Sequence, residues 1–243
     1  MRNAIMLAVL LAVVLPAGCA SRAWNGEIQT WGTLRGVLRD GDTAGKVSLS
    51  QVSKPDSVGI GAPEGLAGEI VVLRGDTWVS RAGPSGLAET QHPAPLDMKA
   101  TFLAMATVAR WAESRTHAAQ SLGGLATAVR TAAEKNGVDT TAPFPFVVEG
   151  GFATIKLHVL NGRCPFARPR AADFSAHKPV RVHTEGVRGV LVGFYSDGPP
   201  GVLTHAGKKV HVHAVLNDEH QTVGHVEAVS VDPGAVIRVP AVR

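Results

Sequence analysis

The 243-residue sequence is poor in cysteine and in aromatic residues. It has two cysteines and one tyrosine, and aromatic residues make up 5% of the chain. Lys and Arg are scattered, and no stretch alternates basic with aromatic side chains, as a surface that stacks nucleic-acid bases would. We therefore expect no nucleic-acid partner, although the formal net charge is +4.

The apolar run at residues 4–15 is too short to span a bilayer comfortably. It follows Arg2 and leads to small residues that end at Cys19, which is the pattern of a secretory signal. The stretch Leu15-Pro16-Ala17-Gly18-Cys19 resembles the bacterial lipobox, in which the cysteine becomes the lipidated N-terminus. We expect a signal peptide at residues 1–18, a tether at 19–27 and one folded domain at 28–243.

This reading predicts an exported protein. It would be a cell-envelope lipoprotein, attached to the membrane only through lipid on Cys19, or a periplasmic or secreted protein after ordinary cleavage behind Ala20. In either case Cys164 stands alone, and no intrachain disulfide is possible.

The pattern of the remaining chain favours strands over helices. The 27 glycines indicate many turns, and Ser121 and Gly137 bound one clear helix with apolar residues at helical spacing over 122–133. Residues 101–111 fit a helix or a strand, and alternation favours the strand. The predicted fold is of the α/β class, α+β type: β-rich, with mixed or antiparallel sheets in two packed halves and few helices. Further strands are expected at 69–73, 77–80, 153–159, 180–183, 187–194, 209–216 and 223–231.

Three histidines fall on two of these strands. His211 and His213 share a face of their strand, because side chains alternate with a period of two. A hairpin turn centred on Glu219 would place His225 directly opposite His213 and on the same face. Three neutral imidazoles that converge, with positions left for water or substrate, are typical of a catalytic zinc site.

We therefore predict a divalent metal, zinc or another ion that accepts nitrogen ligands, on His211, His213 and His225. The other histidines have no such pattern and are interpreted as ordinary core or surface residues. They are His92, His117, His158, His177, His183 and His205, with His220 in the turn.

These residues resemble the bacterial acetolactate decarboxylase family. The family carries a His-x-His strand and, about a dozen residues later, a Gly-His strand, matched here by His211-Val212-His213 and Gly224-His225. The stretch Gly189-Val190-Leu191-Val192-Gly193-Phe194 is similar to another family strand, and Gly68-Glu69 to its Gly-Glu strand. The resemblance runs in collinear order over nearly all of the mature chain.

The resemblance implies zinc on three histidines and decarboxylation of (S)-2-acetolactate to (R)-acetoin, with the metal chelating the ketone and hydroxyl oxygens. It implies that Glu69 is the active-site carboxylate and that Arg170 binds the substrate carboxylate. The expected partners are a small 2-hydroxy-3-keto acid and, as an assembly, a second copy of the chain.

The chain departs from the family at its C-terminus, because the family's tail glutamate has no counterpart after Asp232. Glu227 lies two residues after His225, and therefore on the same strand face. We predict that it works at the site, as a fourth ligand, as a carboxylate that orients an imidazole, or as the missing acid.

Two other functions remain open. A zinc site with three histidines can also activate water, which would make the protein an ester hydrolase. A metal- or ligand-binding envelope lipoprotein without catalysis is the third reading. A cupin is excluded because its glutamate follows the second histidine more closely than Glu219 does here.

Overall fold

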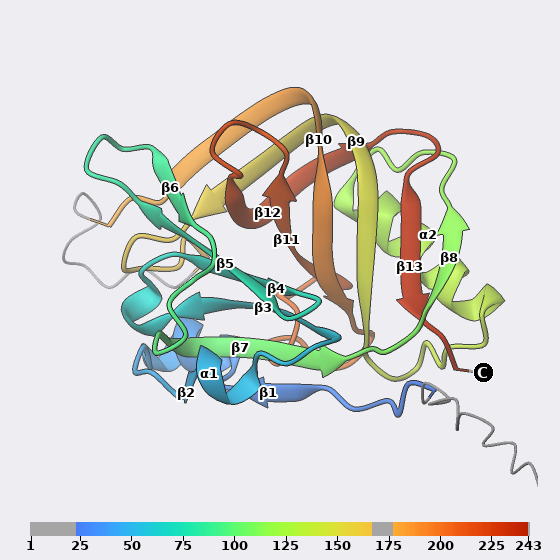
Figure 1. Ribbon diagram of the computed structural model, residues 1–243, viewed down its shortest axis with the longest axis horizontal. Coiled ribbons are helices and arrows are strands. Elements are labelled where there is room, and N and C mark those ends of the chain that lie inside the picture. Colours follow the sequence, from blue (N-terminus) through green and yellow to red (C-terminus); the bar gives the residue numbers. More distant parts are fainter. Residues whose placement is uncertain (1–22, 167–176, 243) are drawn as a thin grey trace, which may run out of the picture.

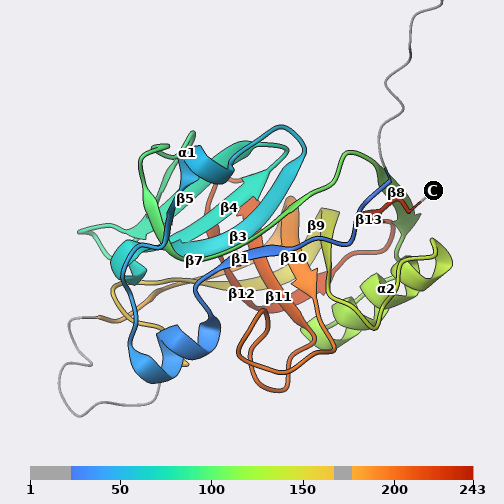
Figure 2. The same cartoon turned by 90° about the horizontal axis from the view of Figure 1, so that it is seen from below.

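The computed structural model describes residues 23–166 and 177–242, which form two antiparallel sheets packed against each other. Figures 1 and 2 show the two sheets and, beside the second one, the long helix α2 (Leu122–Lys135). The prediction of a β-rich fold with few helices is confirmed. In the described part of the chain, no helix is both long and apolar enough to cross a lipid bilayer.

The first sheet is built from the N-terminal strands in the order β1-β7-β3-β4-β5-β6, with β2 paired to β7. In β4, Ile70 and Val72 lie in a core on the outer face of this sheet, whereas Val71 faces the second sheet. Glu69 shares the face of Val71, because side chains alternate along a strand. The strands are β1 (Gln29–Trp31), β2 (Val47–Ser48), β3 (Ser57–Pro63), β4 (Glu69–Leu73), β5 (Asp76–Ala82), β6 (Ala88–Gln91) and β7 (Lys99–Thr107).

The second sheet has the order β10-β11-β12-β9-β13-β8, and β10 also pairs with β9. The strands β9, β10, β11 and β12 therefore close on themselves. The strands are β8 (Trp111–Arg115), β9 (Phe144–Val159), β10 (Val180–Tyr195), β11 (Val210–Leu216), β12 (Val223–Val231) and β13 (Val236–Pro240).

The helix α2 covers the face of the second sheet that points away from the first (Figure 1). The side chain of Ser121 caps it by accepting a hydrogen bond from Gly124 N, as the sequence predicts. Leu125 and Val129 are buried against β11, β12 and β13 in one core. Three short helical segments, all in the N-terminal half, are η1 (Gly36–Asp40), α1 (Leu49–Val52) and η2 (Glu64–Leu66).

Three strand predictions need correction. Residues 101–111 do not form one strand, because β7 ends at Thr107 and β8 begins at Trp111. The strand β9 is 16 residues long, whereas the sequence predicts a strand at 153–159 only. The strand β10 is also 16 residues long, whereas the sequence predicts two separate strands at 180–183 and 187–194.

The signal peptide and Cys19 lie outside the described residues, and these predictions remain untested.

Candidate metal centre

The three predicted histidines lie in the interface between the two sheets. Val210, Val212 and Ala214 of β11 point into the core beneath α2, so His211 and His213 point to the opposite face. His225 pairs directly with His213 across β11 and β12, which confirms the predicted register.

The three imidazole rings lie close together and are buried. Ring centroids are 5.3 Å apart for His211 and His213, 4.9 Å for His211 and His225, and 5.4 Å for His213 and His225. All three side chains are buried. Two neighbouring strands thus direct three rings into one cavity, as the hairpin geometry predicts.

Backbone carbonyls fix the orientation of two of these rings. His211 Nδ1 donates to Leu203 O at 2.8 Å, and His213 Nδ1 donates to Ile70 O at 3.0 Å. A carbonyl oxygen can only accept, so the proton of each neutral ring is on Nδ1 and the lone pair is on Nε2. This arrangement is typical of histidines that bind a metal through Nε2.

Burial keeps these imidazoles neutral. It lowers the pKa of His213 to about 3, with a smaller opposing effect from the hydrogen bond to Ile70. Burial and the neighbouring imidazoles hold the pKa values of His211 and His225 well below their ordinary value. Metal binding requires neutral imidazole, so no proton has to leave these rings before an ion binds at neutral pH.

Glu69, at the start of β4, brings a carboxylate to the same cavity. It is 2% exposed, and its Oε2 lies 3.5 Å from His213 Nε2. Its Oε1 lies 3.7 Å from His158 Nε2 and has no hydrogen-bond partner among the described residues. Burial raises the pKa of Glu69 well above its ordinary value, against a smaller lowering effect of a backbone hydrogen bond at Leu160.

The donor set fits a divalent cation. The lone pair of His213 Nε2 faces a carboxyl oxygen, an arrangement that either a proton or a cation between the two atoms would stabilise. A buried carboxylate without a partner is costly, and a metal ion beside it would offset that cost. The nitrogen-rich set suits zinc and the other ions that prefer imidazole.

His158 and His205 also line this cavity, which their interpretation as ordinary core or surface residues did not predict. His158 pairs with His225 across β9 and β12, with ring centroids 4.7 Å apart. His205 comes from the connection between β10 and β11. Its ligand atom and those of His211 and His225 all lie within 4.8 Å of one another. Burial lowers the pKa of both His158 and His205 to about 4.

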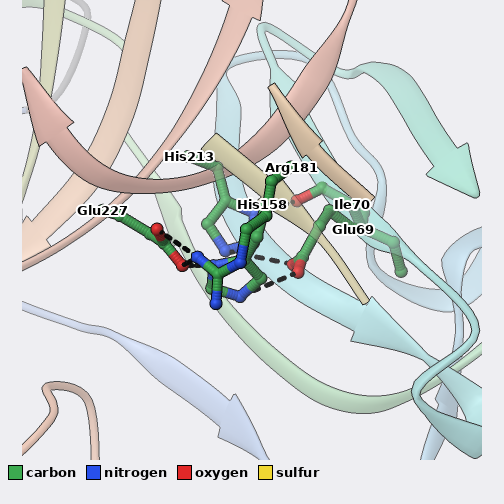
Figure 3. A network of polar contacts seen from close by, with 6 residues as sticks. All are labelled: Glu69, Ile70, His158, Arg181, His213 and Glu227. Carbon is green, nitrogen blue, oxygen red and sulfur yellow. Dashed lines mark hydrogen bonds and ion pairs between the residues drawn. The ribbon is translucent and has the colours of Figure 1, made fainter. Parts of the chain in front are cut away.

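Glu227 contacts His158, a histidine that is not one of the three predicted ligands (Figure 3). Its Oε1 lies 3.0 Å from His158 Nδ1, and Arg181 Nη1 donates to both carboxylate oxygens at 2.5 and 2.6 Å. The carboxylate thus fixes the orientation of one imidazole, which is one of the three roles predicted for it. Arg170, the predicted substrate-binding arginine, lies outside the described residues.

The cavity beside the imidazoles is small and otherwise mainly apolar, with a volume of about 30 Å³. A larger surface pocket, of about 510 Å³, lies near Trp24, Gln51 and Met105 and contains no histidine. The chemistry of the site therefore belongs to the smaller cavity. Its apolar wall is formed by Leu34, Val37, Leu38, Ala62, Leu66, Phe102 and Leu160, beside Cys164.

Comparisons with known proteins agree with this architecture. The family model described as alpha-acetolactate decarboxylase matches residues 32–240. Among solved structures, alpha-acetolactate decarboxylase from Bacillus subtilis strain 168 has a TM-score of 0.69 at 17% identity, covering 88% of this chain and 85% of that chain. A Staphylococcus aureus protein of unknown function, similar to alpha-acetolactate decarboxylase, has a TM-score of 0.62 at 15% identity, covering 87% and 84%. No curated protein matches.

Proposed function

The chain belongs to the alpha-acetolactate decarboxylase family, as its motifs predict, and from this premise we propose that it is a metal-dependent carbon–carbon lyase. The proposed reaction is decarboxylation of (S)-2-acetolactate, a 2-hydroxy-3-keto acid, to (R)-acetoin. The proposed ion is zinc, held by His211, His213 and His225. The observation that supports this most strongly is a set of buried, neutral imidazoles beside a partnerless oxygen of Glu69.

The residues of the site suit this chemistry. When bound, the metal supplies a Lewis acid that stabilises negative charge on the substrate oxygens as carbon dioxide leaves. His211 and His213 present Nε2 to the ion because their Nδ1 atoms are held by backbone carbonyls. The apolar wall of the cavity excludes water and so strengthens each charge interaction inside it.

Glu69 is the proposed proton carrier. Among the described residues its Oε1 has no hydrogen-bond partner, and burial raises the pKa of its carboxyl group, which favours a group that can hold a proton and return it. We propose that it takes the proton of the substrate hydroxyl and delivers a proton to the carbon that has lost carbon dioxide. In the net reaction, one proton from solvent replaces carbon dioxide.

Further features are proposed from the sequence. Arg170 would bind the substrate carboxylate, and the chain would be exported, with a lipid anchor on Cys19 or in a periplasmic or secreted form. A homodimer is the proposed assembly.

The test combines metal analysis with an acetoin assay on the purified protein. We expect about one zinc ion per chain and acetoin from racemic acetolactate, with consumption of one enantiomer. His213→Ala should lose both metal and activity, whereas His220→Ala, at an exposed turn position, should keep both. Metal-loaded protein that forms no acetoin would refute the proposed reaction.

An ester hydrolase is the second candidate. Three imidazoles that hold a metal ion with open positions can activate water. Hydrolysis of a simple aryl ester in the same preparations, lost in His213→Ala, would favour this candidate. Metal binding without either reaction would favour a binding protein of the cell envelope.

A further inference from the structure

His205 occupies a place in the cavity that matches that of a predicted ligand. Its ring centroid lies 5.3 Å from that of His211 and 5.3 Å from that of His225. The corresponding distances for His213 are 5.3 and 5.4 Å. The rings of His205 and His213 therefore lie at nearly the same distances from the rings of His211 and His225. In addition, the ligand atoms of His205, His211 and His225 lie within 4.8 Å of one another.

The connection that carries His205 is attached to the site itself. Leu203 and Thr204, the two residues before His205, are 6% and 1% exposed. Leu203 O accepts the hydrogen bond that orients His211, and Thr204 O accepts one from Gly201 N at 2.8 Å. The backbone is therefore fixed directly before His205. The ring is placed by this anchored turn rather than by a free surface loop.

His158 does not offer the same geometry, although its ring also borders His225. Its Nδ1 is bound to Glu227, and its Nε2 lies 3.7 Å from Glu69 Oε1. Its ligand atom is not part of the close group formed by His205, His211 and His225, and neither is that of His213, whose Nε2 instead lies 3.5 Å from Glu69 Oε2. Of the two unexpected histidines, only His205 joins the cluster of possible metal ligands.

We propose that His205 is a fourth imidazole ligand, so that the metal centre is built by β11, β12 and the connection between β10 and β11. This inference rests on the proposed metal site but not on the proposed substrate. Among the described residues that line the cavity, Glu69 would then be the one carboxylate beside four neutral imidazoles.

The test uses two variants that separate ligation from packing. His205→Gly removes the imidazole and leaves a space that free imidazole can occupy. His205→Gln fills the space and keeps hydrogen-bonding capacity but provides a poor metal ligand. Affinity for Zn²⁺ is measured by competition with a chromophoric chelator. The ligand set is followed by the visible spectrum of the Co²⁺-loaded protein, with His220→Ala as the matched control.

We expect both His205 variants to bind Zn²⁺ at least about 10–100-fold more weakly than the wild type. Loss of a group that only hydrogen-bonds to a metal-binding imidazole already lowers metal affinity by about this factor. Free imidazole should restore the affinity and the Co²⁺ spectrum of His205→Gly but not those of His205→Gln. The inference is overturned if either variant keeps the wild-type affinity and spectrum, or if imidazole fails to rescue His205→Gly. Wild-type protein that binds no metal would instead refute the proposed metal site, and this inference with it.

Discussion

The number of protons released when a metal binds reports directly on how the site is built. The perturbation is removal of metal with a chelator, followed by addition of Zn²⁺ at pH 6. At this pH an ordinary histidine, with a pKa near 6.5, is about three-quarters protonated. Three such ligands would have to release about two protons, and the competition would cost about 2–3 kcal/mol, or roughly 70-fold in affinity.

Burial in the present site removes this competition. The pKa of His213 is lowered to about 3, and the pKa values of His211 and His225 lie well below the ordinary value. All three rings are therefore neutral at pH 6 in the metal-free folded protein. Burial raises the pKa of Glu69, and a cation beside the carboxyl group would favour loss of its proton. We therefore expect release of no more than about one proton, and that proton comes from Glu69.

The assay is isothermal titration calorimetry of Zn²⁺ binding in several buffers that differ in their enthalpy of ionisation. The slope of the binding heat against the ionisation enthalpy of the buffer gives the number of protons released per ion. Glu69→Gln should bring the count close to zero, and His220→Ala should leave it unchanged. Release of two or more protons by the wild type would mean that the imidazoles are protonated before binding. That result would refute the buried, neutral site.

Further outcomes follow from the same contacts. Glu69→Gln should lower the rate of acetoin formation by about 10²–10⁴-fold, with metal content retained, because the proposed proton carrier is lost. Glu227→Ala should lower the free energy of unfolding by about 1–3 kcal/mol, since the buried His158 Nδ1–H loses its acceptor. Arg181→Ala should lower it by less than about 1 kcal/mol, because the arginine side chain is 58% exposed; urea titration of both variants measures these changes. Metal-free protein should lose stability as the pH falls from about 6.5 through about 4, because the unfolded chain binds the protons of the buried histidines, His158 among them, more tightly than the folded chain does. His158→Gln should make that loss up to about 3 kcal/mol smaller, and equal pH slopes for the two proteins would contradict this assignment.

The predicted part of the site is the part that local periodicity controls. Alternation along one strand and a short hairpin bring His211, His213 and His225 together, and both features are visible in the sequence. His158 reaches the site only because β9 pairs with β12, a contact between strands far apart in the chain. His205 depends on an irregular turn that has no sequence period. Long-range pairing and loop conformation are set by the packed structure, so sequence patterns did not identify these two residues.

The strands β9 and β10 are longer than the sequence predicts, and both contain glycines inside the continuous strand. A Cβ on Gly150 would lie 2.6 Å from the side chain of Ala235, and one on Gly189 would lie 2.5 Å from Val215 O. These positions need glycine because neighbouring elements approach closely. The helix and the β4–β5 hairpin were predicted because their caps and turns are local.

The position of the cavity also connects its chemistry to the packing of the fold. The second sheet supplies the imidazoles of β11 and β12, whereas β4 of the first sheet supplies both Glu69 and the Ile70 carbonyl that orients His213. A second link lies nearby, where Trp78 Nε1 of β5 donates to Gln221 Oε1 in the β11–β12 turn at 3.3 Å. A metal ion on these groups would draw its ligands and their orienting partners from both sheets. The stability gained on metal binding would therefore reside in the interface between the sheets, where the free energy of binding and that of folding are coupled.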